Sequence, residues 1–473
     1  MANVLTAPEV ATPPRTNVVV AVLAAGGIVV SLMQTLVIPL LPQLPKLLGA
    51  SASDTAWAIT ATLLAAAVAT PVMGRLGDMY GKRRMLLVSL ALLVAGSALG
   101  GLSDSLAPMV CARALQGLAA GVIPLGISIM RDELPAEKLG AATALMSASL
   151  GVGGALGLPA AAFLAEHADW HVLFWTAAGA GVIVTVLVFL LVPESAQRSG
   201  GTFDLPGAVG LSAALISLLL AVSKGAGWGW TSGLTLGLFA IGVVALLVWG
   251  WWELRVTQPL VDLRTTARHQ VLITNMASAA FGFAMLAQSL VIPQVLQLPE
   301  ATGYGLGRSM MAVGLVMAPS GLVMMLIAPL SARISALSGP RTTLIVGAIV
   351  VAAGYGLGIE FMSAIWGLVF VSCVIGAGIG LAYGAMPALI MSAVPVTETA
   401  AANALNTLMR SIGTSIASAV TGVVIAQLTI SLGGTELPSE NAFRMVLVIA
   451  AVAALAAGAL AAFLPRRAAV ATD

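Results

Sequence analysis

Charged residues are scarce in this chain of 473 residues: they make up 8% of it, whereas 59% of its residues are hydrophobic. A soluble domain carries roughly 25% charged residues, so this composition excludes a water-soluble fold. Cysteine is scarcer still. Cys111 and Cys373 both fall within apolar stretches, where cysteine usually packs as a small apolar side chain rather than forming a disulfide.

Several patterns typical of enzymes are also absent. The sequence has no Gly-rich nucleotide loop of the Walker type, no cluster with metal-ligand spacing and no pairing of a nucleophile with a base. ATP-driven transport and membrane enzymology therefore have no support. We expect no catalytic residue, no cofactor, no metal and no nucleic-acid partner.

Long apolar runs are what the sequence does have. Runs of about 20 residues match the roughly 30 Å of hydrocarbon that a helix must cross, so membrane lipid is the expected solvent. The predicted spans are 17–41, 53–76, 83–102, 107–130, 140–164, 171–192, 205–223, 231–252, 271–297, 308–333, 341–359, 364–393, 399–429 and 443–464.

The basic residues between these spans are unevenly distributed. With a cytoplasmic N-terminus, fifteen Lys and Arg residues fall on the inner side and four on the outer side. This asymmetry follows the positive-inside rule and fits an even number of helices. We therefore expect a monomeric multi-pass protein of the cell membrane, with both termini in the cytoplasm.

The chain also repeats itself, as secondary transporters commonly do. Gly140–Met146 is similar to Ala400–Asn406, and 74–83 is more weakly similar to 332–341. Chance similarity in an apolar chain is the alternative. The simplest layout has an N-terminal tail (1–16), a six-helix bundle (17–195), an inserted helix pair with its linkers (196–268), a second six-helix bundle (269–465) and a C-terminal tail (466–473).

The loop between the second and third predicted spans carries a cluster of charges. Gly74 and Gly81 allow a tight turn, Asp78 supplies a carboxylate, and Lys82 and Arg83 surround it with cations. Such a cluster could latch two helix bundles in one conformation and release them in another. It could equally be a positive-inside anchor without a mechanistic role.

This loop resembles a signature of the major facilitator superfamily, Gly-x-Leu-x-Asp-x-x-Gly-Lys-Arg over residues 74–83. The resemblance implies an all-α membrane protein with the major facilitator fold: two six-helix bundles plus two inserted central helices, fourteen transmembrane helices in all. In that family the aspartate helps to stabilise the outward-open state, so the resemblance assigns this role to Asp78.

Arg113 stands in an otherwise apolar helix. A guanidinium at membrane depth costs at least roughly 2.5–3.5 kcal/mol, so we expect it to face a wet cavity or a partner; an arginine that snorkels to the outer interface is the alternative. Arg113-x-x-Gln116-Gly117 is similar to the helix-4 motif of proton-coupled drug exporters. That similarity implies a role of Arg113 in proton transfer.

The fifth predicted span is rich in glycine and contains a proline. Gly153, Gly157 and Pro159 would let this helix pack closely and pivot, so we predict a hinge here. The segment resembles the antiporter motif of the family only in part, because Leu158 stands at the proline position and Ala161 and Ala162 replace glycines.

Scattered matches extend the resemblance to the fourteen-helix drug:proton antiporter branch of the superfamily. They are Trp57, Asp169-Trp170, Val192–Ser195, Phe203-Asp204-x-x-Gly207 and Pro259–Arg264. The resemblance implies an exporter of drug-like or natural-product compounds that is coupled to proton influx by alternating access. A uniporter or symporter of the same superfamily is the second interpretation, and a non-transporting membrane receptor the third.

The first span departs from that branch, which usually carries Leu-Asp-x-Thr there. This chain has Met33 at the acidic position, and every Asp and Glu falls in a tail, a loop or a helix end, whereas Arg113 and Arg410 lie within spans. A buried carboxylate is the usual counter-charge for a lipophilic cation. We therefore expect a neutral or anionic amphipathic substrate that meets Arg113 or Arg410, unless Arg410 belongs to a structural network.

Two acids remain as candidates for proton coupling besides Arg113. They are Asp54, which could simply cap a helix because it follows Ser51, and Glu360, which could be a solvated loop residue. The candidates for the substrate cavity are embedded polar residues or their neighbours, each of which could instead mediate helix packing: Met33, Gln34, Thr62, Arg113, Asn275, Gln288, Tyr383, Asn406 and Arg410.

Overall fold

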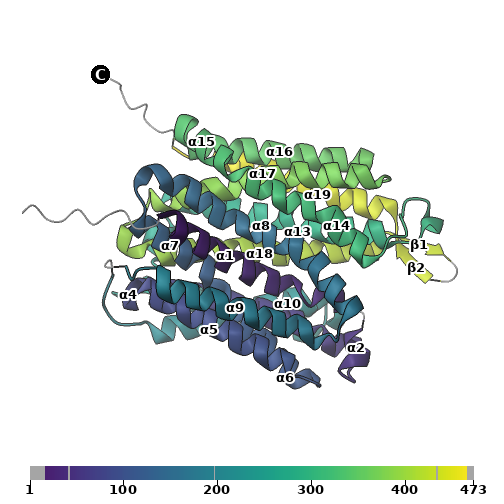
Figure 1. Ribbon diagram of the computed structural model, residues 1–473, viewed down its shortest axis with the longest axis horizontal. Coiled ribbons are helices and arrows are strands. Elements are labelled where there is room, and N and C mark those ends of the chain that lie inside the picture. The colour runs from purple at the N-terminus through teal and green to yellow at the C-terminus, as the bar shows by residue number, and fades with distance from the viewer. Residues whose placement is uncertain (1–15, 41–42, 196–197, 433–434, 466–473) are drawn as a thin grey trace, which may run out of the picture.

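The computed structural model describes residues 16–40, 43–195, 198–432 and 435–465, and helices dominate it (Figure 1). Fourteen helical stretches are long and apolar enough to cross a membrane, which confirms the predicted number. They are α1 (Thr16–Thr35), α4 (Trp57–Tyr80), α5 (Lys82–Gly101), α6 (Leu106–Gly117) continued by α7 (Val122–Glu133), α8 (Ala136–His167), α9 (His171–Leu191), α10 (Leu205–Trp228), α11 (Gly233–Glu253), α13 (His269–Gln297), α14 (Met310–Leu326) continued by α15 (Ala328–Ser338), α16 (Pro340–Phe361), α17 (Ile365–Met391), α18 (Thr399–Gln427) and α19 (Glu440–Ala461).

Short elements connect these helices. They are η1 (Ile38–Leu40), α2 (Leu44–Leu47), α3 (Ala52–Thr55), η2 (Leu118–Gly121), α12 (Leu263–Thr266), η3 (Glu300–Thr302), η4 (Val396–Glu398) and the strands β1 (Thr429–Leu432) and β2 (Thr435–Pro438). The first predicted span, 17–41, extends too far, because α1 ends at Thr35 and a separate turn of η1 follows. The chain segment of η1 contains a proline, which cannot donate the backbone hydrogen bond that continues a helix.

The strands β1 and β2 form an antiparallel hairpin that the sequence analysis did not predict. The hairpin projects beyond the helices at one end of the molecule, which we call the hairpin end (Figure 1). The hydroxyl of Tyr304 donates a hydrogen bond to the carbonyl of Pro438 and so ties the hairpin to the loop after α13. The opposite end, where α1 begins and α19 ends, is called the terminal end below.

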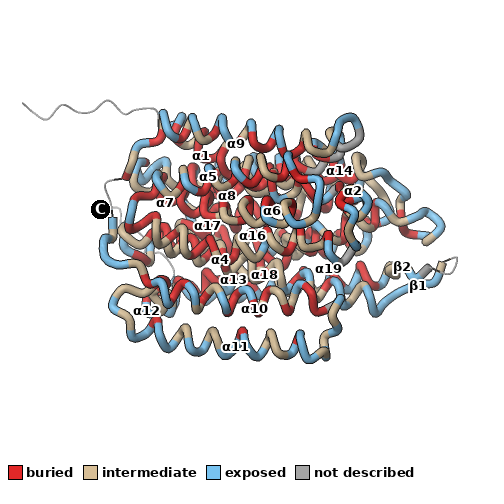
Figure 2. The backbone as a smooth tube through the Cα atoms, turned by 90° about the horizontal axis from the view of Figure 1, so that it is seen from below, coloured by how far each residue is buried: buried red, intermediate tan, exposed pale blue. Residues whose placement is uncertain are grey.

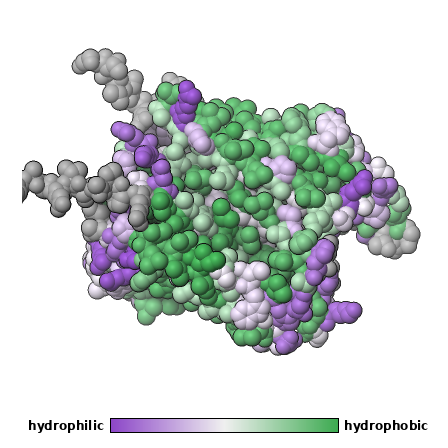
Figure 3. Space-filling model, viewed as in Figure 1, coloured by the Kyte–Doolittle hydropathy of each residue, from purple (hydrophilic) through white to green (hydrophobic). Residues whose placement is uncertain are grey.

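Four groups of buried apolar residues build the interior of the described chain. One comes almost wholly from residues 19–192, one almost wholly from residues 273–464, and a smaller one joins α10 to α4 and α18 through Leu211, Leu215 and Leu408. The fourth and smallest joins α13 to the end of α17. The pair α10 and α11 lies along one side of the bundle, with α11 outermost (Figure 2). Apolar residues also dominate the face of the molecule that Figure 3 shows, as expected for helices that face lipid.

Close packing at two glycines reflects the internal repeat. A Cβ atom on Gly153 of α8 would stand 2.6 Å from the carbonyl oxygen of Ile28 in α1, and one on Gly413 of α18 would stand 1.8 Å from that of Ala279 in α13. Each glycine thus lets the fifth helix of its half pack against the first helix of the same half. The two glycines occupy equivalent positions of the aligned segments.

We predict that Gly413→Ala destabilises the protein, because the added methyl group overlaps the backbone of α13. Overpacking of this kind costs about 1–3 kcal/mol. Thermal unfolding of the detergent-solubilised protein should show a lower midpoint for this variant. Gly422→Ala in the same helix is the matched control, because a Cβ at Gly422 meets nothing within 4 Å. Equal midpoints for both variants would contradict the close contact.

Candidate functional site

Asp78, at the terminal end of α4, connects the two halves of the molecule. Its side chain is fully buried, and its oxygens accept hydrogen bonds from the backbone amides of Ala400 (3.2 Å) and Ala401 (2.8 Å). These amides belong to the first turn of α18, where backbone N–H groups have no partner within the helix and the helix dipole favours a negative charge. The carboxylate of one half therefore caps a helix of the other half.

Gly74 makes this contact possible. A Cβ atom at Gly74 would stand 2.6 Å from the Cβ of Ala404 and 2.8 Å from the carbonyl oxygen of Ala400. Any larger residue would push α4 away from α18 and lengthen the hydrogen bonds to Asp78.

The predicted ring of cations around Asp78 is only partly present. Lys82 Nζ lies 3.9 Å from Asp78 and 2.6 Å from Asp132 at the end of α7, so Asp132 is its principal partner. Arg83 turns away and donates to the carbonyl of Phe189. Gly81 has φ +117°, a conformation that glycine adopts readily, and its nearest side chain is Glu194. The expectation that Arg83 surrounds Asp78 was wrong: the chain turns at Gly81 and directs Arg83 toward α9.

Arg131 is a second link between the halves that the sequence analysis missed. Its guanidinium donates to the hydroxyl of Thr399 (2.6 Å) and to the carbonyl of Val394 (3.1 Å). The charged triplet Arg131-Asp132-Glu133, just after the fourth predicted span, could have indicated this link. In the sequence analysis, Arg131 was counted only among the basic residues of the inner side. Arg131 and Asp78 together hold the start of α18 against α4 and α7.

A small cavity lies between the halves farther inside the molecule, and in this conformation it leaves only about 10 Å³ of space, room for about one water molecule. Its lining comes from α7, α8, α17 and α18 and includes Tyr383, Asn406 and Arg410 from the predicted set. The guanidinium carbon of Arg410 lies 4.8 Å from the ring centre of Tyr383, an attractive cation–π distance. None of the ten residues that line this cavity is acidic: Ile123, Ile127, Ser147, Tyr383, Met386, Pro387, Asn403, Asn406, Thr407 and Arg410.

Asn275 supports this cavity from behind without lining it. Its side-chain oxygen accepts a hydrogen bond from Asn406 Nδ2 (3.0 Å), and the hydroxyl of Ser278 donates to the carbonyl of Asn406 (3.1 Å). These bonds orient Asn406, whose helix carries Arg410 one turn later. The part of α13 that carries Asn275 and Ser278 therefore acts as a helix-packing surface.

Arg113 lies in a different place. Its buried guanidinium donates to the carbonyls of Ala58 (3.1 Å) and Met33 (2.9 Å) and to Gln116 Oε1 (2.7 Å). Arg113 does not line the cavity between the halves. The prediction of a partner is confirmed, but that partner is backbone rather than an acid. Carbonyl oxygens of α1 and α4 thus replace the missing carboxylate at Met33.

The other predicted cavity residues are dispersed. Gln34 is exposed, the buried hydroxyl of Thr62 donates to the carbonyl of Ala58 within its own helix, and Gln288 is buried in α13. Lining residues of the central cavity include none of these three.

The two acids predicted for proton coupling are exposed. Asp54 accepts a hydrogen bond from the hydroxyl of Ser51 (2.7 Å), and its own amide donates back to that hydroxyl (3.1 Å). This geometry favours the capping interpretation of Asp54. Glu360 lies exposed near the end of α16.

The predicted hinge residues of α8 pack against both halves. Gly157 faces Thr35 of α1, and Pro159 faces Gly314 of α14, where a Cβ would stand 2.7 Å from the proline Cα. Pro159 lies inside the continuous helix α8. Close contact of this helix with α1 and α14 places any bending of α8 at the boundary between the halves.

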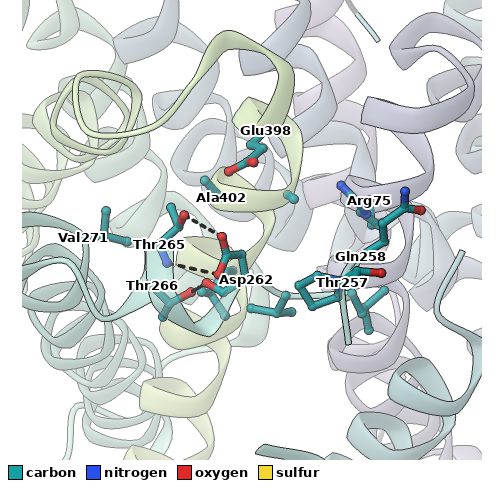
Figure 4. A pocket seen from close by; sticks show the side chains of 14 residues that line it. Arg75, Thr257, Gln258, Asp262, Thr265, Thr266, Val271, Glu398 and Ala402 are labelled. Atoms are coloured by element: carbon teal, nitrogen blue, oxygen red, sulfur yellow. Dashed lines mark hydrogen bonds between the residues drawn. The ribbon is translucent and has the colours of Figure 1, made fainter. Parts of the chain in front are cut away.

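A larger pocket, with about 150 Å³ of space, opens near the terminal end beside the contact of Asp78 with α18. Figure 4 shows Arg75, Asp262 and Glu398 around it. Burial alone would raise the pKa of Asp262, but hydrogen bonds from the hydroxyl and amide of Thr265 and the amide of Arg264 hold it below its usual value. The linker between α11 and α12 forms one wall of this pocket.

Comparison with known proteins defines the class. The sequence profile of the Major Facilitator Superfamily matches residues 23–298 and 276–472, so the chain belongs to this superfamily of membrane transporters. The fold agrees: the human organic anion transporter MFSD10 superposes with a TM-score of 0.65 at 16% identity, over 95% of this chain and all of that one. The proton:xylose symporter XylE gives the same score at 14% identity, over 95% of this chain and 96% of that one.

Sequence relatives at modest identity are named as resistance, export or transport proteins. The tetracenomycin C resistance and export protein of Streptomyces glaucescens is 29% identical over 85% of this chain and 74% of that protein. The multidrug resistance protein Stp of Mycobacterium tuberculosis is 25% identical over 87% of this chain and 76% of that protein. An uncharacterised MFS-type transporter of M. tuberculosis is 30% identical over 66% of this chain, and the match spans 46% of that longer protein.

We predict that Asp78→Asn loosens the contact at the start of α18, because a neutral amide accepts these hydrogen bonds more weakly. Hydrogen bonds to a charged group contribute about 1.5–3 kcal/mol, so the open population should rise roughly tenfold or more. A cysteine at Asn403, with Cys111 and Cys373 replaced by serine, should then react faster with a membrane-impermeant maleimide. Asp104→Asn is the control, since that side chain is 90% exposed. An unchanged rate in Asp78→Asn would remove Asp78 from the latch.

Proposed function

We propose that this chain is a secondary active transporter that exports amphipathic drug-like or natural-product compounds in exchange for protons. The observation that carries the proposal is the central cavity between the two halves, closed off at one end by the contacts of Asp78 and Arg131 with α18. Alternating access requires such a site together with a contact that can be broken on one side. The names of the relatives support export of antibiotics as the direction and substrate class.

The charge of the cavity supports a neutral or anionic substrate. Arg410 contributes a cation, Tyr383 and Met386 contribute apolar or aromatic surface, and the lining contains no carboxylate. An apolar wall with a few polar groups suits drug-sized molecules once the halves move apart and widen the cavity. A lipophilic cation would enter without a counter-charge, which costs desolvation energy that nothing in the lining offsets.

The membrane setting follows the same proposal. We place the terminal end in the cytoplasm, with the hairpin outside the cell membrane, and take the protein to be a monomer surrounded by lipid. Arg113, Asp54 and Glu360 remain the predicted residues of proton coupling. A proton-independent uniporter or symporter is the second candidate function, and the absence of an acid from the cavity lining favours it.

Inverted membrane vesicles separate these functions. With tetracenomycin C, the compound named for the Streptomyces relative, as first substrate, we expect uptake that collapses when an uncoupler removes the proton gradient. Uptake that survives the uncoupler would support the second candidate. The lack of any flux across a panel of aromatic acids and neutral antibiotics would contradict transport of this class.

We further predict that Arg410→Gln lowers uptake of an anionic substrate about tenfold or more, because a charge-assisted hydrogen bond of about 1.5–3 kcal/mol is lost. Arg410→Lys, which keeps the charge, should retain part of the activity.

Met33→Asp should introduce efflux of a cationic dye such as ethidium, since it restores the carboxylate beside Arg113. Strong efflux of the dye by the unmodified protein would contradict the assigned substrate class.

A further inference from the structure

The inserted helix pair begins and ends on a carboxylate at the terminal end. Asp204 caps α10: its Oδ1 accepts a hydrogen bond from the amide of Gly207 (2.9 Å) and another from the indole N–H of Trp252 (3.1 Å). Glu253 is the last residue of α11 and only 3% exposed. Both acids are therefore withdrawn from solvent, although the sequence places them at helix ends.

The two carboxylates border one small space. A Cβ atom at Gly207 would stand 2.1 Å from Asp204 Oδ2 and 2.9 Å from Glu253 Oε1. Neither oxygen of Glu253 accepts a hydrogen bond of normal geometry from the described residues. The indole N–H of Trp249 and the amides of Leu260 and Val261 face this carboxyl group, and the Trp249 N–H likewise has no well-formed acceptor.

Two arginines that follow Glu253 in the chain, Arg255 and Arg264, are engaged elsewhere. Arg255 stacks on the ring of Trp251, with 4.1 Å between the guanidinium carbon and the ring centre, and Arg264 donates to the carbonyl of Leu254 (3.2 Å). Among the described residues, no ion pair joins Asp204 or Glu253 to a Lys, Arg or His.

The helices that pack against α10 bring further charged groups to the terminal end. Arg75 of α4 and Glu398, just before α18, line the neighbouring pocket of about 150 Å³, and Asp262 on the linker is occupied in capping α12. Asp204 is thus the charged group that borders Glu253 directly. Two buried carboxylates that share one space without a cation cannot both stay ionised, because each raises the energy of the other's charge.

We propose that Asp204 and Glu253 form a proton-binding site, in which the pair holds one proton and one negative charge. Asp204 is the ionised member, because it receives two well-formed hydrogen bonds from N–H donors. Glu253 is the protonated member and presents its O–H to the shared space. This site differs from the three residues predicted for proton coupling, and it lies outside the central cavity.

The proton-binding site also lies near the contact between Asp78 and the start of α18. Leu260 and Val261, whose amides face Glu253, line the 150 Å³ pocket together with Ala401, the residue whose amide binds Asp78. Loss of the proton would place two negative charges in the shared space, and their repulsion would displace Glu253 and the linker segment 257–262. Proton release would thereby loosen one wall of the pocket beside α18. This second step, unlike proton binding itself, rests on the proposed function.

Infrared difference spectroscopy on the purified full-length protein tests proton binding. We expect a protonated carboxyl C=O band that shifts in D₂O, disappears on raising the pH and is lost in Glu253→Gln. In Asp204→Asn the band should persist and should disappear at a lower pH than in the unmodified protein, because Glu253 is freed from the neighbouring charge. Glu137→Gln, which removes an exposed glutamate without an assigned role, is the control and should leave the band intact. A spectrum without this band at every pH, or one that Glu253→Gln leaves unchanged, would overturn the proposal.

Labelling of a cysteine at Val261 tests the second step. Its side chain is 6% exposed, so in a chain with Cys111 and Cys373 replaced by serine it should react slowly at low pH. We expect the rate to rise severalfold as the pH is raised, and to stay low throughout when Glu253→Gln is added. A labelling rate that does not change with pH, while the infrared band titrates, would overturn the proposed movement of the linker segment 257–262. The proton-binding site itself would then still hold. Neither result depends on flux, so a failure of proton-coupled export in vesicles is distinguishable from a failure of this site.

Discussion

A polar group inside a bilayer must find its partner within the protein, because lipid tails offer neither donors nor acceptors. The buried side chains of this transporter follow that constraint closely. Arg113 donates to two carbonyl oxygens of neighbouring helices, and the hydroxyl of Tyr355 donates to the carbonyl of Ala284. Asp78 accepts from two amides that the start of α18 leaves free. Backbone groups at bends and helix ends thus replace the counter-ions that a soluble protein would draw from water or from other side chains.

The same constraint explains how a fully buried carboxylate can belong to a moving contact. If α18 withdraws, Asp78 loses two hydrogen bonds, and an unpaired buried charge is costly. Lys82 already lies 3.9 Å away and could take over as partner, while its present partner Asp132 also accepts from the hydroxyl of Ser195. Asp78 thus has one partner in the opposite half and another in its own half. Two states of similar energy are what a transporter needs in order to alternate.

The charges are also separated along the membrane normal. Arg410 lies at the central cavity, where the lining has no acid, whereas Asp78, Asp132, Asp204 and Glu253 gather at the terminal end. Under the proposed function, this division would assign substrate recognition to the middle of the molecule and the buried carboxylates to the terminal end. The terminal end of the inserted pair α10 and α11 carries two of these acids.

Much of this architecture was predictable from the sequence, and the reason is physical. Hydrocarbon thickness sets helix length, so apolar runs predicted fourteen spans, and the internal repeat places Gly153 and Gly413 at equivalent positions of the two halves. The charged loop likewise identified Asp78. What the sequence could not decide is which atoms face one another across helices distant in the chain. The tertiary structure alone gave Arg113 its carbonyl partners, directed Arg83 away from Asp78, brought Arg131 to Thr399 and buried Glu253 beside Asp204. These contacts depend on how each helix is rotated and on how closely helices pack at glycines. A hydropathy pattern is an average over a window of residues, so it contains neither piece of information.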